Sequence, residues 1–195
     1  MRFERLSIDD VVLITPRKFE DSRGYFMESF RAALFETEVG PFSFVQDNHS
    51  MSAQVGTVRG LHFQLEPKAQ GKLVSCIAGG LLDVAVDIRT GSPTYGRFVA
   101  QELSANNARQ LWVPPGFAHG FCTLIPNTVV SYKVTEYYSP EHDRGVFWND
   151  PAIGIEWPVE IENAILSDKD QEQPMLTDLG EVFRYTADRV RHQNS

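Results

Sequence analysis

Residues 72–88 read KLVSCIAGGLLDVAVDI, with two apolar segments on either side of a glycine pair. The segments 72–78 and 81–88 have the length and the β-branched content of buried strands. A pair such as Gly79-Gly80 between two strands predicts a two-residue hairpin, because glycine adopts the positive φ values that such turns require. The stretch therefore predicts a β protein.

Similar segments continue the pattern on both sides. Clusters of proline, glycine and asparagine separate short runs that are rich in β-branched and aromatic residues. The further expected strands are residues 11–15, 25–30, 98–103, 110–113, 117–124 and 128–138. Many short strands at regular spacing are typical of a β-sandwich, jelly roll or barrel.

Two segments have helical character, residues 31–39, which end at Gly40, and residues 179–191 near the C-terminus. We expect a single domain over residues 1–195, because an all-β domain of this length need not be divided. We expect residues after about 191 to be frayed.

The composition restricts the partners. The 195 residues carry a formal net charge of −8, and an acidic chain has no general attraction for nucleic acid. The N-terminus lacks the apolar core of a signal peptide, and no apolar run is long enough to cross a bilayer. The two cysteines, Cys76 and Cys122, lie in apolar stretches and are expected to be buried thiols. We expect a cytoplasmic protein with no nucleic-acid or membrane partner.

Two histidines lie in glycine-containing β segments. Residues 56–64 read GTVRGLHFQ, where His62 and Gln64 share one face of a strand and Arg59 lies close by. Residues 113–120 read VPPGFAHG, so that a rigid Pro-Pro-Gly turn precedes His119. His62 is either a base beside an arginine that binds an anion or a structural histidine with a hydrogen-bonded ring.

A tyrosine-rich segment, YKVTEYY at residues 132–138, is expected to place Tyr132, Glu136 and Tyr138 on one strand face. These tyrosines are either core residues or a proton donor at Tyr132 with a stacking ring at Tyr138. Lys72 is either a solvated lysine or a cation that holds a developing oxyanion.

Together these residues resemble the dTDP-4-dehydrorhamnose 3,5-epimerase family over almost the whole chain. The matching motifs are DSRGYF at 21–26 with Glu28, QDNHS at 46–50, RGLHFQ at 59–64, KLV at 72–74, DVAVDIR at 83–89, SPTYG at 92–96, PGFAHGF at 115–121, WND at 148–150 and LSDKD at 166–170. The resemblance implies an all-β cupin jelly roll, a homodimer formed by exchange of N-terminal strands, and no metal or organic cofactor.

The implied reaction inverts C3 and C5 of dTDP-4-dehydro-6-deoxy-D-glucose and gives dTDP-4-dehydro-L-rhamnose for dTDP-L-rhamnose biosynthesis. The resemblance implies His62 as the base, Tyr132 as the acid and Lys72 at the enolate oxygen. It also implies Asp170 as the carboxylate that holds His62, with Asp168 as the alternative.

Further site residues follow from the same resemblance. Asp83 has two possible roles. It either adjusts the pKa of Lys72 or of Tyr132, or it is a structural residue that only makes hydrogen bonds. The implied substrate-binding residues are Arg23 and Arg59 on the diphosphate, Glu28, Gln46, Asp47 and Asn48 on the nucleoside, Phe19 and Tyr138 beside the thymine, His119, Asp143 and Lys169 along the sugar and diphosphate, and Gln64. Asp143 stands where relatives often carry glutamate.

Three alternatives stay open. The first is an epimerase of a related sugar that acts at C3 or C5 alone. The second is a metal-dependent cupin, whose sites usually take two histidines and a carboxylate from the first motif. Here Gln64 replaces the second histidine, and Glu66 lacks the ligand spacing, so three ligands are not reached. The third is a non-catalytic sugar-binding cupin, which would fit the loss of His62, Lys72 or Tyr132, and none of these is lost.

Overall fold

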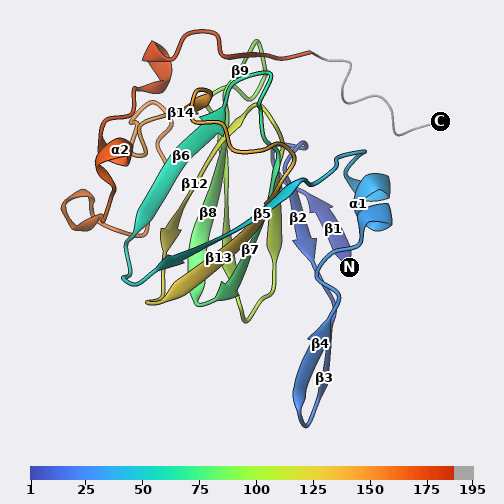
Figure 1. The fold of residues 1–195 in the computed structure, drawn as a ribbon. Helices are drawn as coiled ribbons and strands as arrows, with labels where there is room; N and C mark the ends of the chain where they lie inside the picture. Colours follow the sequence, from blue (N-terminus) through green and yellow to red (C-terminus); the bar gives the residue numbers. More distant parts are fainter. Residues whose placement is uncertain (187–195) are drawn as a thin grey trace.

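The computed structural model describes residues 1–186. Two antiparallel sheets face each other and form the predicted jelly roll (Figure 1). The six-stranded sheet has the order β1 (Arg2–Arg5), β2 (Val12–Thr15), β11 (Gln110–Val113), β7 (Lys72–Ala78), β13 (Thr128–Val134) and β5 (Gln46–Ser52). The five-stranded sheet has the order β10 (Phe98–Ser104), β8 (Gly80–Asp87), β12 (Phe117–Thr123), β6 (Val58–Gln64) and β14 (Asp143–Gly145).

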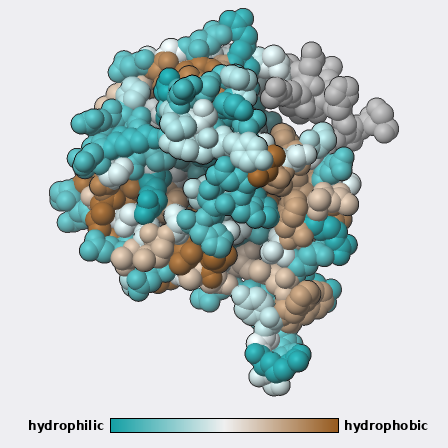
Figure 2. Space-filling view, in the orientation of Figure 1, coloured by the Kyte–Doolittle hydropathy of each residue, from teal (hydrophilic) through white to brown (hydrophobic). Residues whose placement is uncertain are grey.

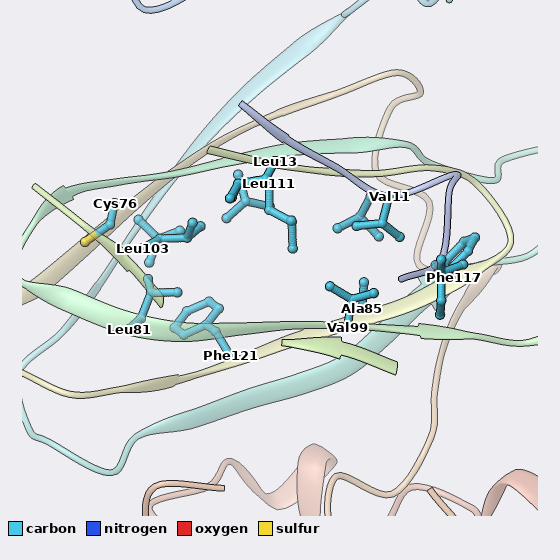
Figure 3. Packing of buried hydrophobic residues seen from close by; sticks show 14 residues of the cluster. Val11, Leu13, Cys76, Leu81, Ala85, Val99, Leu103, Leu111, Phe117 and Phe121 are labelled. Carbon is cyan, nitrogen blue, oxygen red and sulfur yellow. The ribbon is translucent and has the colours of Figure 1, made fainter. Parts of the chain in front are cut away.

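The main core lies between the two sheets (Figure 3). Alternation along each strand sends every second side chain inward, so Leu81 and Ala85 of β8 face Leu111 of β11 and Val11. Each buried leucine or valine contributes about 1.5–3 kcal/mol to the free energy of unfolding. Cys76 and Cys122 are buried free thiols, as the sequence predicts.

Other segments of the chain pack on the outer face of each sheet. Helix α1 (Ala32–Glu38) confirms the helix expected near residues 31–39, and it packs Phe35 against Trp112 with ring centroids 5.1 Å apart. On the five-stranded sheet, Leu61 and Val84 pack against Ile155 from the C-terminal third of the chain. That third also carries η1 (Ile161–Asn163), α2 (Asp168–Gln171) and η2 (Leu176–Asp178).

Strands β3 (Lys18–Asp21) and β4 (Gly24–Met27) form a hairpin that extends away from both sheets (Figure 1). Phe19, Tyr25 and Phe26 on this hairpin are 52%, 55% and 71% exposed. Figure 2 shows hydrophobic surface on the hairpin above a hydrophilic tip. A two-stranded hairpin alone is marginally stable in water, and exposed apolar surface of this kind is typical of a docking element.

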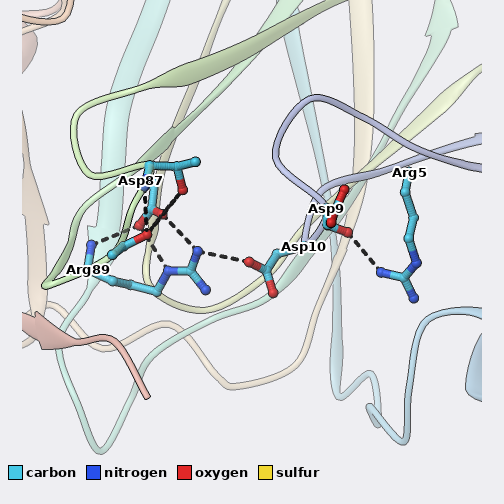
Figure 4. Close-up of polar contacts among 7 residues, drawn as sticks. Arg5, Asp9, Asp10, Asp87 and Arg89 are labelled. Carbon is cyan, nitrogen blue, oxygen red and sulfur yellow. Dashed lines mark hydrogen bonds and ion pairs between the residues drawn. The ribbon is translucent and has the colours of Figure 1, made fainter. Parts of the chain in front are cut away.

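Arg89 contacts three separate parts of the chain beside the sheets (Figure 4). Arg89 donates to the buried Asp87 carboxylate at 2.8 and 2.9 Å and to Asp10 at 2.9 Å. Its guanidinium lies 4.5 Å from the ring centroid of Phe117 and 5.2 Å from that of Tyr185. Arg89 therefore joins the loop before β2, the end of β8 and the C-terminal segment.

The predicted hairpin at Gly79-Gly80 is wrong. Strand β7 pairs with β11 and β13, whereas β8 pairs with β10 and β12, so the chain crosses between sheets at the glycine pair. Gly79 has a φ of +76°, and a Cβ there would lie 2.4 Å from Thr128 Oγ1. A glycine is therefore needed at position 79 for this tight crossing.

Several element boundaries also differ from the prediction; strand β4, for example, ends at Met27 and not at residue 30. Strand β13 ends at Val134. The Thr135 N–H still donates to the Gly71 carbonyl oxygen at 3.0 Å, but the Gly71 N–H donates to the Thr135 side-chain hydroxyl at 2.8 Å. Tyr138 therefore lies beyond the strand that carries Tyr132. Residues 179–186 contain no helix; they form β15 (Phe183–Arg184), which pairs in parallel with β9 (Arg89–Thr90).

The C-terminal helix prediction fails in residues 179–186 for a local reason. Gly180 has a φ of +69°, which interrupts a helix, and Phe183 packs on Phe63 with ring centroids 5.9 Å apart. The rest of that predicted helix, and the fraying expected after about residue 191, lie outside the described residues. Within residues 1–186, no helix is long and apolar enough to cross a membrane.

Candidate active site

Strands β6 and β12 bring the two histidines together. Their antiparallel register places His62 directly opposite His119. Next to this pair the register shifts, and a Cβ on Gly60 would lie 2.5 Å from Gly120 Cα and 2.8 Å from the His119 carbonyl oxygen. Glycine is required there, since its φ of +131° also disfavours any other residue. Two glycines thus allow the close backbone approach beside the two histidines.

His62 is held by a buried carboxylate. Its Nε2 lies 2.5 Å from Asp170 Oδ1, and Asp170 is 3% exposed. Asp168, the alternative partner, is exposed. Burial alone would raise the pKa of Asp170, but the hydrogen bonds from His62 and Ser167 and nearby positive charge hold that pKa below its usual value. The carboxylate therefore stays ionised and can stabilise a protonated imidazole.

Lys72 lies beside the histidine strand. Its Nζ donates to the His62 carbonyl oxygen at 3.3 Å. Burial lowers the pKa of Lys72 to about 8, although the charges of Asp143 and Asp83 act to raise it. The ammonium form is still the main form at neutral pH, and it is available to a developing negative charge.

Tyr132 points inward from β13, where it packs against the core between the sheets. Burial raises the pKa of its hydroxyl, and Arg59 opposes that rise. Tyr132 therefore keeps its proton at neutral pH, as a proton donor must. Arg59 donates to Ser52 Oγ at 3.1 Å and to the Met51 carbonyl oxygen at 3.2 Å, which directs its guanidinium towards β5.

A second histidine–carboxylate pair lies on the same sheet. His119 Nε2 is 2.8 Å from Asp83 Oδ1, and Asp83 is fully buried. The other carboxylate oxygen, Oδ2, has no hydrogen-bond partner among the described residues. The direct partner of Asp83 is thus His119, and its charge acts on Lys72 from a distance.

Tyr138, Asp143 and Lys169 form a connected group, here called the Tyr138 cluster. The Tyr138 hydroxyl donates to Asp143 Oδ2 at 3.0 Å, and Lys169 Nζ contacts the same oxygen. This hydrogen bond raises the pKa of the Tyr138 hydroxyl. Asp143 thus reaches both partners despite the short aspartate side chain. Gln46 lies next to the cluster: its Oε1 accepts the Tyr138 N–H at 3.2 Å, and its Nε2 donates to Asn48 Oδ1 at 2.8 Å.

Four of the expected substrate-binding residues lie away from the site residues of the same chain. Phe19, Arg23 and Glu28 lie on or just after the projecting hairpin, where Arg23 pairs with Asp21 at 2.6 Å (Figure 1). Asp47 lies between Gln46 and Asn48 on β5, so it points to the opposite face, where it binds Lys133 Nζ at 2.9 Å.

Comparison with known proteins identifies the family. The family model described as dTDP-4-dehydrorhamnose 3,5-epimerase matches residues 5–178. The chain belongs to that family. It is 62% identical to the dTDP-4-dehydrorhamnose 3,5-epimerase of Sinorhizobium fredii, over 95% of this chain and 94% of the relative. An epimerase structure from Legionella pneumophila, a complex with dTDP-4-keto-L-rhamnose, superposes with a TM-score of 0.91 at 44% identity, over 95% of this chain and 99% of that one.

Epimerases of narrower action also match this member of the dTDP-4-dehydrorhamnose 3,5-epimerase family, at lower identity. The dTDP-4-dehydrorhamnose 3-epimerase of Streptomyces niveus is 36% identical over 91% of this chain and 85% of the relative. The difference between 62% and 36% identity places the chain nearer to the double epimerase of S. fredii.

Ser167 contacts the Asp170 carboxylate of this epimerase, and the sequence analysis did not propose it as a site residue. Ser167 caps α2, and its Oγ donates to Asp170 Oδ2 at 2.8 Å while it accepts the Asp170 N–H at 3.2 Å. Ser167 thus binds the carboxylate oxygen that His62 leaves free. The signal was present, because Ser167-Asp168-Lys169-Asp170 has the serine-to-acid spacing of a helix capping box.

The residues of this epimerase do not form the ligand set of a metal cupin. In residues 1–186, no three His, Cys, Asp or Glu side chains converge on a common point. Gln64, at the position of the second histidine, is 3% exposed, and both polar atoms of its amide are bonded to backbone groups. The metal-dependent alternative therefore lacks ligands in the described part of the chain.

Proposed function

We propose that this epimerase inverts C3 and C5 of dTDP-4-dehydro-6-deoxy-D-glucose and forms dTDP-4-dehydro-L-rhamnose, in dTDP-L-rhamnose biosynthesis. The observation that carries the proposal is the His62–Asp170 pair, at 2.5 Å, beside Lys72. The family assignment and the high identity to double epimerases support the same reaction.

The chemistry follows from the C4 ketone of the substrate. The ketone acidifies the hydrogens at C3 and C5, so His62 takes a proton and the C–H electrons move into an enolate. Lys72 holds the negative enolate oxygen. Tyr132 then delivers its hydroxyl proton to the opposite face of the carbon, which re-forms the C–H bond with inverted configuration. His62 releases its proton, and the Tyr132 phenolate regains one, so the reaction is a net isomerisation.

Each group has a rough energetic role. A positioned acid or base contributes about 10²- to 10⁴-fold to the rate. Loss of one donor to an oxyanion costs on the order of 10²- to 10³-fold. Asp170 keeps the imidazole oriented and stabilises its charged form, so we assign it to positioning of the base.

For substrate binding, we propose that Arg59 holds the diphosphate and that the Tyr138 ring stacks on the thymine. His119, together with Asp143 and Lys169 of the Tyr138 cluster, is assigned to the sugar and diphosphate. Gln46 and Asn48 lie beside Tyr138 and are assigned to the nucleoside.

We propose that the chain is a homodimer in which the hairpin of one copy completes the site of the other. The hairpin would carry Phe19, Arg23 and Glu28 to the partner's site, since none of them joins the site of its own chain. The exposed aromatic residues of the hairpin support this arrangement.

The compartment is proposed as the cytoplasm. Both cysteines of the chain are unpaired thiols, which suits a reducing compartment.

No nucleic-acid partner is proposed, because the net charge of −8 gives the chain no general attraction for nucleic acid.

A second candidate is inversion at C3 alone, supported by the likeness to the S. niveus 3-epimerase. Hydrogen exchange in D₂O, followed by NMR on dTDP-4-dehydro-6-deoxyglucose with metal-stripped enzyme, distinguishes the two. Deuterium at both C3 and C5 is the expected result. Deuterium at C3 alone would favour the second candidate, and no exchange at either carbon would refute the substrate assignment.

A further inference from the structure

Four consecutive residues after β13, Glu136 to Ser139, have backbone groups bonded to glutamine side chains. The Glu136 carbonyl oxygen accepts from Gln70 Nε2 at 2.7 Å. The Tyr137 carbonyl oxygen accepts from Gln64 Nε2 at 3.1 Å. The Tyr138 N–H donates to Gln46 Oε1 at 3.2 Å, and the Ser139 N–H donates to Gln64 Oε1 at 2.8 Å.

These three glutamines, Gln46, Gln64 and Gln70, are here called the glutamine clamp. They come from different parts of the two sheets: Gln46 begins β5, Gln64 ends β6, and Gln70 precedes β7. Together they hold a loop that has left the β-ladder and would otherwise have unpaired backbone groups.

Gln64 is the central member of the clamp. It is 3% exposed, and its Nε2 also donates to the Lys68 carbonyl oxygen at 2.6 Å. Its amide therefore uses both donor hydrogens and its acceptor oxygen on backbone groups. Only an amide can do this, because a carboxylate would face two carbonyl oxygens and an apolar side chain would leave three backbone groups without this partner.

The clamp acts on Tyr138. Among residues 1–186, the side chain of Tyr138 makes a single hydrogen bond, to Asp143, and the residue is 56% exposed. Its ring position therefore depends on the backbone that Gln46 and Gln64 bind on either side. A ring held in place before the ligand arrives loses less entropy when a base stacks on it.

We infer that Gln64 is a positioning residue, which orders the loop at residues 136–139 and thereby presents Tyr138 to the nucleobase. This inference rests on the proposed function for the role of Tyr138. It also revises the role of Gln64 among the expected substrate-binding residues, since its amide is fully occupied by the protein.

The first test does not need the ligand. Amide hydrogen exchange of the full chain reports directly on the N–H groups of Tyr138 and Ser139. In Gln64→Met, both amides are expected to exchange faster than in wild type. In Val99→Ala, a core variant on β10 that loses stability without touching the loop, they are expected to keep their protection. Unchanged exchange at both amides in Gln64→Met would overturn the clamp.

The second test measures binding of dTDP by calorimetry. Gln64→Met is expected to raise Kd roughly tenfold, because three part-buried backbone groups lose their partner and the loop is less ordered before dTDP binds. The rise in KM should exceed the fall in kcat, since the His62–Asp170 pair is left intact. Combining Gln64→Met with Tyr138→Ala should weaken binding no further than Tyr138→Ala alone.

The outcomes separate the two proposals. Fully additive effects of the two substitutions, or wild-type affinity in Gln64→Met, would overturn the positioning role. If wild type itself bound no dTDP while the loop amides still responded to Gln64→Met, the proposed function would fail and the clamp would stand. If Gln64→Met does not fold, Gln70→Met replaces it in the exchange experiment. This variant removes the hydrogen bond from Gln70 to the Glu136 carbonyl oxygen. Unchanged amide exchange around residue 136 would then count against the clamp.

Discussion

In the proposed reaction, the buried Lys72 provides a positive charge at a cost in stability. Burial lowers its pKa from 10.5 to about 8, while Asp143 and Asp83 keep it from falling further. The side chain is thus charged at neutral pH but loses its proton much sooner than a solvated lysine. Its charge is available to an enolate, and the folded protein bears the cost of desolvating that charge.

Rate and stability should therefore respond to pH in opposite directions. Activity is expected to fall as pH rises through about 8, because the Lys72 ammonium is lost. Between about 8 and 10.5 the unfolded chain binds more protons at this lysine than the folded one, so its contribution to the free energy of unfolding rises with pH. Rates and denaturant unfolding measured across this range test both trends. Lys72→Met should lack the gain in stability, and full activity at the upper end would contradict the role of Lys72.

The aspartate that contacts His62 can be tested against its neighbour. Asp170→Asn is expected to lower kcat by about 10²- to 10⁴-fold, because an amide cannot stabilise the imidazolium that forms on His62. Asp168→Asn is the control, since Asp168 is exposed and should leave kcat close to wild type. Steady-state kinetics of the two variants decide between them. A larger loss in Asp168→Asn would contradict the assignment.

Strands β6 and β12 depend on a close glycine contact. Gly60→Ala is expected to cost roughly 2–4 kcal/mol in the free energy of unfolding, because the new Cβ would meet the backbone of Gly120 and His119. Gly91→Ala is the control, since its φ of +85° brings strain but no atom lies within 4 Å of the new Cβ. Denaturant unfolding of both variants measures the difference. Equal losses would show that strain alone, without the close contact, accounts for the effect.

Most elements could be predicted from the sequence because buried strands are short runs rich in β-branched and aromatic residues, separated by proline, glycine and asparagine. The bounds 72–78 and 110–113 agree with the structure to the residue. Strands β1, β3 and β5 were missed because they consist mainly of polar residues and contain no apolar run. The crossing at Gly79 was misread because a tight hairpin and a change of sheet need the same glycines, and distant strands decide between them.

Some residues of the candidate site could also be predicted from the sequence, and others could not. His62 and Tyr132 could be proposed from local motifs, whereas Asp170 came only through the family resemblance, since it lies far along the chain from His62. The glutamine clamp could not be predicted, because its partners are backbone groups that every residue possesses. No pattern of side chains marks which carbonyl or amide an interior glutamine will bind.

For the whole molecule, the main prediction concerns the shared site of the proposed dimer. Arg23→Ala and His62→Asn should each lose most activity when assayed alone. Mixed dimers should regain activity, because one of their two sites then combines an intact His62 with an intact Arg23 from the other copy. Activity after mixing and subunit exchange measures this recovery. If each hairpin served its own sheets, mixing would restore nothing.

The order of the strands also has a consequence for synthesis of the chain. The strand that carries His62 has neighbours β12 and β14, which appear far later in the sequence. Residue 123 leaves the ribosome about 60 residues after residue 64, so β6 waits roughly 3–12 s without a partner at 5–20 residues per second. During those seconds an apolar strand with free edges is exposed to association with other nascent chains. We therefore expect the newly made chain to depend on chaperones until β12 is available to pair with β6.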